Sequence, residues 1–402
     1  MTGAAPGAAA RAERSYVLAV LGAHLAFMPL FALLLPRRVN DIAPGSAVAT
    51  LSWLLLVGGI VASVAHIAAG KLSDHWCARF GQRRGLVAIG TAAVVGAYAL
   101  FAWATDVRSL FAAIIVFQLA LNLMFAPLGA MLTDHVADER KGRVAAMMNS
   151  ALPLSAIGTS LAAALFPIDG AGGFLFVGAL SAGTALPLIL TAHLPRVAAT
   201  PRAAAGPMLA IAWPDFARVW VARLLIQSGA AFLLNFFYLF VASRPAMTGS
   251  AASRAFGMMA ALSVVASVSA ALVAGAWSDQ RRTRRRPMIG GALACALSLA
   301  ILAGADGWPM MIIGYVLFNA GLTIFLSADS ALVAQLLGGH PRRGEYLGYM
   351  NLTNTLPAIV VPALALGMLA QTPQIDWSLG FSGAGLLALA AGLLVTRIRT
   401  ID

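Results

Sequence analysis

GKLSD at residues 70–74, followed by GQRR at 81–84, is a motif that the chain repeats as GAWSD at 275–279 and RRRP at 284–287. A second matching pair is Met148-Asn149 and Met350-Asn351. The two pairs have nearly equal separations, 279 − 74 = 205 and 351 − 149 = 202 residues. The 402-residue chain therefore consists of two copies of one unit of about two hundred residues, a period too long for a solenoid.

The composition places both copies in a membrane. Hydrophobic residues make up 60% of the chain and charged residues 10%, whereas soluble domains average about 25% charged residues. Twelve apolar runs, six in each copy, are long enough to cross about 30 Å of hydrocarbon. Because lipid offers the backbone no hydrogen-bond partners, helices are the expected spans. The runs lie at about 15–35, 48–71, 86–104, 109–133, 144–166, 173–193, 217–242, 255–277, 287–305, 309–336, 346–369 and 378–396.

The sequence thus predicts an all-α membrane protein with twelve transmembrane helices in two pseudo-symmetric six-helix bundles. Such internal repeats are typical of secondary transporters. The expected parts are a tail (1–14), a first bundle (15–193), a linker that contains several prolines (194–216), a second bundle (217–397) and a C-terminal segment (398–402).

The distribution of positive charge predicts the orientation. Of the 27 Lys and Arg residues, 21 lie in segments on the same side as the N-terminus, and such segments are cytoplasmic as a rule. We expect both termini and the linker in the cytoplasm of a cell with a bacterial-type inner membrane. Since topology accounts for the net charge of +12, we expect no nucleic-acid partner.

No enzyme signature stands out. The chain has no Walker loop, and its two cysteines, Cys77 and Cys295, cannot form a disulfide framework or a metal cluster. The histidines and acids show no metal-ligand spacing on one helix. We therefore expect neither an enzyme nor a cofactor or metal.

The Gly-x-x-Ser-Asp and Gly-x-Arg-Arg elements, placed between the second and third spans and partly repeated between the eighth and ninth, resemble the signature loop of the major facilitator superfamily. The run 72–84, with 222–225 and 328–333, is similar to the glycoside–pentoside–hexuronide symporters and the proton-coupled sucrose transporters. Those relatives usually have arginine where this chain has His75. The resemblance implies alternating access with proton-coupled transport of a sugar, glycoside or similar polar solute.

The loop chemistry predicts a conformational latch. Asp74 lies at the inner end of the second span, and Arg83 and Arg84 at the start of the third. Charge-assisted hydrogen bonds between them would hold one conformation closed on the cytoplasmic side. Asp279 and Arg285 are the expected counterparts in the second copy. The alternative is that the arginines serve topology alone.

Asp329 is the first candidate for proton coupling, because it is the one carboxylate well inside an apolar run and burial favours the protonated acid. The alternative is a static pair with Arg223 or a loop arginine. His24, in the first span, is the second candidate, since histidine titrates near physiological pH. It could equally be a packed, neutral residue bonded to the backbone.

Uncharged polar residues recur at helical spacing in three predicted spans. In the superfamily that the chain resembles, helices 1, 4, 7 and 10 line the central cavity, so the resemblance implies a substrate-binding role for these residues. Interhelical hydrogen bonding is the alternative for each of them. They are Gln118 and Asn122 in the fourth span, Gln227, Asn235 and Tyr238 in the seventh, and Tyr315 and Asn319 in the tenth.

Two other functions stay open. The many Met, Phe and Leu residues and the shortage of acids in the expected cavity favour efflux of drug-like or metabolite molecules. Some facilitator-fold proteins resemble membrane assembly factors that transport nothing. For the transport reading, the expected partners are a small-molecule solute, a proton and the lipid bilayer, with the protein acting as a monomer.

Overall fold

The computed structural model describes residues 6–135, 144, 147–148, 151–166, 171–190, 213–244, 250–281, 283–336, 343–370 and 375–398. Within these ranges the chain forms helices and no strand. Eleven helices are long and apolar enough to cross a membrane, and Leu154–Leu165 is a shorter apolar helix. The predicted twelve-span, all-α fold is thereby confirmed. Most of the predicted linker, both chain ends and the side chain of Asp279 lie outside the described residues.

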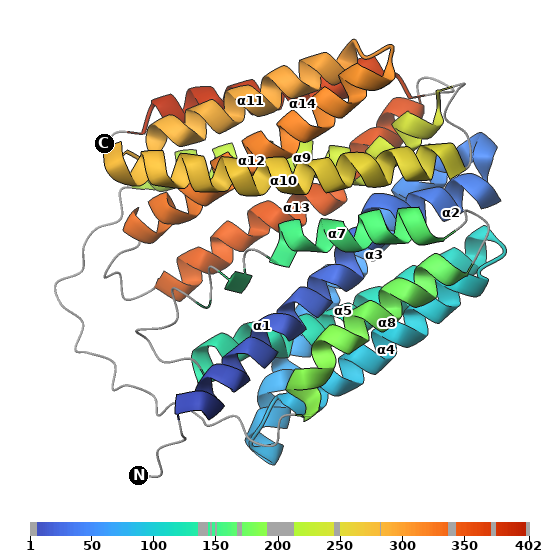
Figure 1. The fold of residues 1–402 in the computed structure, drawn as a ribbon, viewed down its shortest axis with the longest axis vertical. Coiled ribbons are helices and arrows are strands. Elements are labelled where there is room, and N and C mark those ends of the chain that lie inside the picture. The colour runs from blue at the N-terminus through green and yellow to red at the C-terminus, as the bar shows by residue number, and fades with distance from the viewer. Residues whose placement is uncertain are drawn as a thin grey trace. The chain divides into compact units, whose positions relative to one another are not determined.

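Two compact units divide the chain. Unit 1 comprises residues 1–201 and 241–257. In it α1 packs against α5, α7 and α8, while α4 packs against α5 and α8, and α3 against α5. Its α-helices, labelled in Figure 1, are α1 (Pro6–Pro29), α2 (Leu35–Ile42), α3 (Ala47–Phe80), α4 (Arg84–Trp103), α5 (Val107–His135), α7 (Ala151–Leu165) and α8 (Gly172–Leu190). The π-helical turn η1 (Leu30–Leu34) joins α1 to α2, and the short η2 (Pro44–Ser46) precedes α3.

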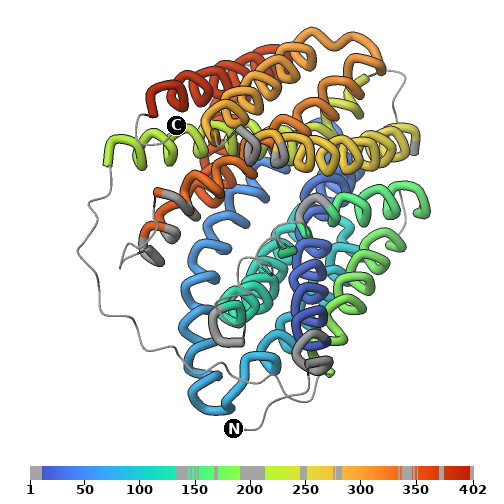
Figure 2. The backbone as a smooth tube through the Cα atoms, turned by 60° about the vertical axis from the view of Figure 1, so that its left-hand side comes forward, coloured from blue at the N-terminus to red at the C-terminus, as the bar shows by residue number. Residues whose placement is uncertain are grey.

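Unit 2 comprises residues 202–240 and 258–402. In it α11 packs against both α12 and α14, and the orange and red helices run side by side in Figure 2. The helices of this half are α9 (Trp213–Ala242), α10 (Ser250–Arg281), α11 (Arg285–Ala303), α12 (Trp308–Leu336), α13 (Arg343–Leu369) and α14 (Trp377–Thr396). The first residues of α10 belong to unit 1.

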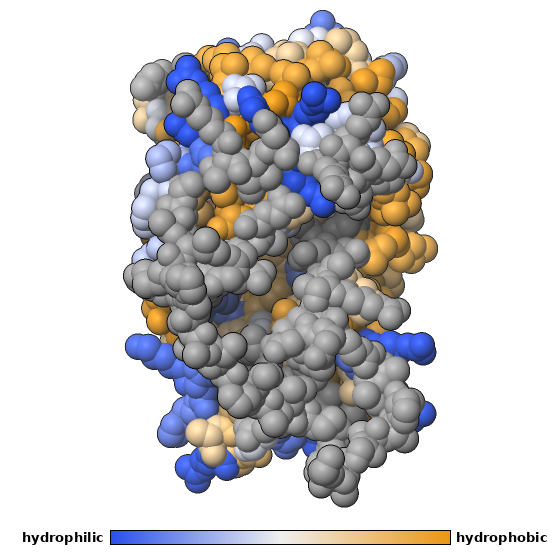
Figure 3. Space-filling model, turned by 90° about the vertical axis from the view of Figure 1, so that its left-hand side faces the viewer, coloured by the Kyte–Doolittle hydropathy of each residue, from blue (hydrophilic) through white to orange (hydrophobic). Residues whose placement is uncertain are grey.

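Large apolar side chains remain on the surface, as Figure 3 shows by its broad orange areas. Leu272 and Val273 are each 70% exposed, and Leu393 is 66% exposed. In a soluble protein such patches would be an aggregation hazard. Because these exposed side chains lie on helices that are apolar enough to cross a membrane, they are the expected contact surface for lipid tails.

Several helices extend past the apolar runs that predicted them. α3 continues to Phe80, so that Asp74 lies within the helix, six residues before its end (80 − 74), and α9 begins at Trp213, inside the predicted linker. A helix can continue through polar residues beyond an apolar run, and the hydropathy of the sequence does not show where it then ends. At the other end of α4, Asp106 accepts a hydrogen bond from the Ser109 amide at 2.7 Å. This bond is the main reason why the pKa of the Asp106 carboxyl is lowered.

Each unit contains a close contact between two of its own helices, and these two contacts lie at equivalent positions of the repeat. A Cβ on Gly90 of α4 would lie 2.7 Å from the Met124 amide nitrogen of α5. A Cβ on Gly291 of α11 would lie 2.8 Å from the Phe325 amide nitrogen of α12. Both glycines and both contacted residues are 201 positions apart (291 − 90 and 325 − 124). Glycine is required because it lets the two backbones approach each other.

We expect Gly90→Val and Gly291→Val to destabilise their units, because the added side chain meets backbone atoms that cannot move aside. Overpacking of this kind typically costs about 1–3 kcal/mol. Thermal unfolding in detergent, followed by fluorescence-detected size exclusion, measures the loss.

The matched controls are Gly96→Val on α4 and Gly290→Val on α11, because a Cβ at either position has no atom within 4 Å. They make the same change of helix propensity without the clash. Equal losses in all four variants would contradict the packing argument.

Candidate functional site

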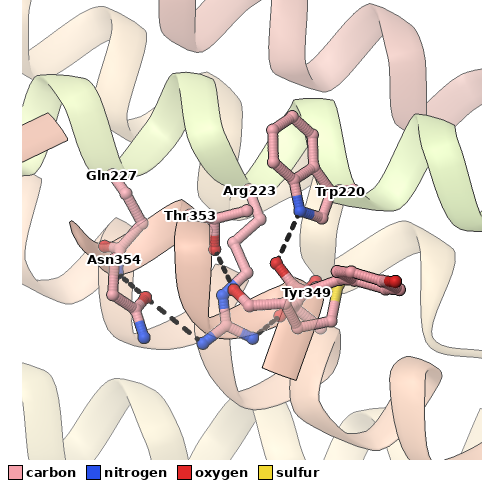
Figure 4. Close-up of polar contacts among 8 residues, drawn as sticks. Trp220, Arg223, Gln227, Tyr349, Thr353 and Asn354 are labelled. Atoms are coloured by element: carbon pink, nitrogen blue, oxygen red, sulfur yellow. Dashed lines mark hydrogen bonds and ion pairs between the residues drawn. The ribbon is translucent and has the colours of Figure 1, made fainter. Parts of the chain in front are cut away.

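Unit 2 contains a polar cluster built by α9, α12 and α13 (Figure 4). Arg223 Nη1 on α9 donates to Asp329 Oδ2 on α12 at 2.8 Å. Arg223 Nη2 lies 3.5 Å from Asn354 Oδ1 on α13, and Gln227 Nε2 donates to the same oxygen at 2.7 Å. The side chain of Asp329 is fully buried, whereas that of Arg223 is 18% exposed. The cluster therefore joins a buried acid to accessible amides.

Helical spacing places these side chains together. Trp220, Arg223 and Gln227 follow one another at intervals of three and four residues, so they share one face of α9. The Trp220 Nε1–H group donates to the Tyr349 carbonyl at 2.7 Å, and Tyr349 lies five residues before Asn354 on α13. This bond fixes the register of α9 against α13. Asp329 reaches the same face of α9 from α12, 106 residues away from Arg223 in the chain.

The predicted polar residues of α5 form a second cluster, in unit 1. Asn122 Nδ2 donates to the Gln118 carbonyl at 2.8 Å, and Asn122 Oδ1 lies 3.1 Å from His66 Nδ1 on α3. An amide oxygen only accepts, so His66 donates from Nδ1 and leaves Nε2 as an acceptor when neutral. Gln118 and Asn122 are buried, and His66 is exposed.

The remaining predicted substrate residues of unit 2 are mostly turned inward. Asn319 donates to the Tyr315 carbonyl of its own helix at 2.8 Å, and the Tyr315 ring stacks on Phe237 with centroids 4.6 Å apart. Asn235 and Tyr238 are buried at 6% and 2% exposure. Among the predicted substrate residues of unit 2 that the structure describes, Gln227 is therefore the one connected to the buried ion pair, through the oxygen of Asn354.

His24 lies apart from both clusters. Its Nδ1 contacts the Val20 carbonyl, one turn earlier on α1, at 2.8 Å. The ring meets Phe125 of α5 edge to face, with centroids 5.3 Å apart. These contacts are those of the packed, backbone-bonded alternative for this residue.

The repeated motif forms a compact corner between α3 and α4. Arg83 Nη1 donates to Asp74 Oδ1 at 2.8 Å and to Ser73 Oγ at 2.7 Å. The Arg83 side chain is 10% exposed and that of Asp74 74%. Gly81 ends α3 in the left-handed conformation, with φ +72°, which glycine adopts without strain. The pair predicted between Asp74 and Arg83 is thus in contact.

The other predicted latch residues have different partners. Arg84 Nε donates to Gln82 Oε1 at 2.5 Å. In unit 2, Arg285 donates to the Thr396 carbonyl at the end of α14. The side chain of Asp279 is outside the described residues, so its place relative to Arg285 is not part of this geometry.

Three participants did not stand out in the sequence as members of these sites. Ser73 is part of the quoted motif, yet its bond to Arg83 depends on the turn at Gly81. The contacts of His66 with Asn122 and of Asn354 with Gln227 join helices far apart in sequence. Polar residues at helical spacing on α13 were the available signal for Asn354, but spacing does not reveal which neighbouring helix such residues face.

Comparison with known proteins gives the family. The model described as "Major Facilitator Superfamily" matches residues 15–253 and 225–402. A search of curated proteins gives no significant match.

Solved structures share the fold at low sequence identity. A D-xylose–proton symporter has a TM-score of 0.72 at 13% identity, with 98% of each chain covered. An auto-inhibited POT family peptide transporter has a TM-score of 0.71 at 13% identity, again with 98% of each chain covered. A nucleoside transporter has a TM-score of 0.68 at 16% identity, with 96% of this chain and 100% of that chain covered. With the family model matching nearly the whole sequence, the chain belongs to the Major Facilitator Superfamily and is a membrane transporter rather than an enzyme.

Proposed function

We propose that the protein is a monomeric, proton-coupled secondary transporter that moves a sugar, glycoside or similar polar organic solute by alternating access. The observation that carries this proposal is the polar cluster of unit 2. It holds a fully buried acid, Asp329, one ion pair away from the accessible amides of Gln227 and Asn354. An ionisable group inside a membrane span is by default a functional site.

The chemistry of the pair suits reversible proton binding. Arg223 stabilises the charged carboxylate of Asp329 at 2.8 Å. If Arg223 moves away, the buried charge becomes costly and the acid takes a proton instead. The position of Arg223 and the proton on Asp329 are therefore linked. His24 is the second candidate for the coupling proton.

The polar groups of the two clusters favour a neutral polar solute. Within unit 2, Gln227 and Asn354 offer amide groups that can hydrogen-bond hydroxyls. Within unit 1, taken by itself, Gln118, Asn122 and His66 offer amide and imidazole groups of the same kind. A sugar presents many such hydroxyls. A proton-coupled sugar symporter is among the solved structures that share this fold.

The efflux alternative loses part of its support. It rests in part on the many large apolar residues, which would line a drug-binding surface. Four phenylalanines of α9, however, are buried within the chain, with exposures of 8% or less. They pack against one another and against Phe381 of α14. The four are Phe232, Phe236, Phe237 and Phe240.

The Asp74–Arg83 contact is proposed as the latch of the transport cycle. It ties the end of α3 to the start of α4 through a charge-assisted bond. Because Asp74 is largely exposed, the bond contributes little to folding and is suited to a contact that forms in one state of the cycle. Asp279 and Arg285 are proposed as the counterpart in the second copy.

We also propose that the chain lies in a bacterial-type inner membrane with both termini in the cytoplasm. The excess of Lys and Arg on one side of the predicted spans supports this orientation.

Asp329→Asn is expected to abolish solute accumulation driven by a pH gradient while exchange of solute continues, because the amide mimics the protonated acid. Proteoliposomes with labelled D-xylose, D-glucose and sucrose measure both activities. The control Asp306→Asn makes the same change at an exposed residue between α11 and α12. Accumulation at the wild-type level would exclude Asp329 and make His24 the residue to test.

Asp74→Asn is expected to slow transport at least tenfold with little change in stability or solute affinity, because a latch affects the balance of conformations, which a ligand experiences as a population factor. Initial rates, thermal unfolding and equilibrium binding separate these effects. The neighbouring exposed His75, as His75→Gln, serves as control. Transport at the wild-type rate by well-expressed Asp74→Asn would refute the latch.

Single cysteines at His75, near the end of α3, and at Thr105, just after the 20-residue helix α4, should label from opposite sides, and both residues are exposed. In a background that lacks Cys77 and Cys295, a membrane-impermeant maleimide added to intact cells is expected to label Thr105→Cys alone. Labelling of His75→Cys alone would reverse the proposed orientation.

A further inference from the structure

Asn354 lies between two side chains of α9, as Figure 4 shows. Its Oδ1 accepts a hydrogen bond from Gln227 Nε2 at 2.7 Å and lies 3.5 Å from Arg223 Nη2. The same guanidinium donates through Nη1 to Asp329 at 2.8 Å. One amide oxygen thus connects an accessible amide to the buried ion pair.

Exposure decreases stepwise along this connection. Asn354 is exposed and Gln227 is half-buried, whereas the Arg223 side chain is 18% exposed and Asp329 is fully buried. A solute that contacts α9 and α13 can reach the two amides but not the acid. Any influence of that solute on Asp329 must therefore pass through Arg223.

The two contacts of the Asn354 oxygen are unequal. The bond from Gln227 has an ordinary length, whereas 3.5 Å from Arg223 is at the outer limit for a hydrogen bond. Gln227 therefore engages the oxygen, and Arg223 is held mainly by Asp329. If Gln227 finds another acceptor, the Asn354 oxygen becomes available to Arg223.

We propose that Asn354 couples solute binding to proton binding, an inference that rests on the proposed function. A solute oxygen accepts the hydrogen bond of Gln227 Nε2, and Asn354 Oδ1 then takes up Arg223 Nη2. The hold of Arg223 on Asp329 weakens, and the carboxylate binds one proton from water, so that its charge changes from −1 to 0. Asp329 Oδ1 can take this proton, since it has no hydrogen-bond partner within the described ranges.

Few other charges face this acid in the part of the chain that the structure describes. Arg223 on α9 is the ion-pair partner of Asp329. On α13, Asn354 and Thr353 are neutral, and the Thr353 hydroxyl donates to the Met350 carbonyl. α11 packs along α12, and its Arg285 donates to the Thr396 carbonyl. The state of Asp329 should thus depend chiefly on Arg223.

The proposal also defines the solute. It must present a hydrogen-bond acceptor, such as a hydroxyl or carbonyl oxygen, to Gln227. A purely apolar solute would leave the Gln227–Asn354 bond intact and would not promote proton uptake. Among the proposed solute classes, sugars and glycosides meet this requirement.

Two substitutions that leave the ion pair intact should shift proton binding in opposite directions. Asn354→Leu removes the competing acceptor, so Arg223 stays on Asp329 and the acid is protonated at lower pH. Gln227→Leu frees the Asn354 oxygen for Arg223, so the acid is protonated at higher pH. The double variant should behave as Asn354→Leu, because Gln227 acts through Asn354.

Infrared absorption of the protonated carboxyl, titrated in the reconstituted full-length protein without solute, measures these midpoints. The band is assigned to Asp329 by its loss in Asp329→Asn. We expect shifts of about half a pH unit, or about threefold in proton affinity. Thr355→Val is the control, since this exposed neighbour on α13 bonds to the Leu352 carbonyl of its own helix. Shifts of the same sign, or none, in the two single variants would overturn the proposal.

A transport measurement adds the solute. In proteoliposomes with labelled D-xylose, D-glucose and sucrose, Asn354→Leu should lose accumulation driven by a pH gradient by a factor at least fivefold larger than any loss in exchange, whereas loss of a solute contact alone would lower both equally. Unchanged accumulation would overturn the proposal. If the wild-type protein exchanges none of these sugars, the proposed solute class is wrong, whereas the infrared midpoints still decide the role of Asn354.

Discussion

A charged side chain inside a membrane-spanning helix must find its partner within the protein, because hydrocarbon offers none. In unit 2 this constraint is met by the bond between Arg223 and Asp329 at 2.8 Å. The bond ties α9 to α12, and the contacts of Arg223 and Gln227 with Asn354 extend the connection to α13. Removing one partner of such a buried pair typically lowers the free energy of unfolding by about 3–5 kcal/mol. The packing of these three helices therefore depends on this ion pair.

Unit 1 solves the equivalent problem without charge. Leu128 of α5 stands 201 positions before Asp329 (329 − 128), and its carbonyl accepts the Tyr16 hydroxyl of α1 at 2.7 Å. The first helix of each unit therefore bonds to the same position of the fourth. A neutral bond between a hydroxyl and a backbone carbonyl does not respond to a proton, whereas an ion pair does. The two contacts share a position on the fourth helix but not on the first, since Arg223 stands 207 positions after Tyr16 (223 − 16). Because the contact of unit 2 alone contains an ionisable acid, the comparison favours unit 2 as the proton-binding half.

The repeat and the apolar runs were enough to predict the fold, since both are properties of the sequence alone. Helix ends were less predictable, because α3 continues past the apolar run at 48–71 to Phe80 and includes Asp74. Arg223 was one of two considered partners for Asp329, and the geometry identifies it. The link through Asn354 could not be predicted, because it depends on how α9 and α13 face each other, and neither helix shows a strong apolar face that would fix this from sequence.

The form of the ion pair is itself an argument for a changing contact. Arginine and carboxylate groups often bond through two parallel hydrogen bonds, which hold both groups rigidly. Here Nη1 donates to Oδ2, while Arg223 Nε and Asp329 Oδ1 are buried without hydrogen-bond partners in the described part of the chain. Such unmet groups carry a free-energy cost, so this state of the pair is not its most stable possible arrangement. A pair that must release its arginine during each cycle benefits from that cost, because less free energy is needed to separate it.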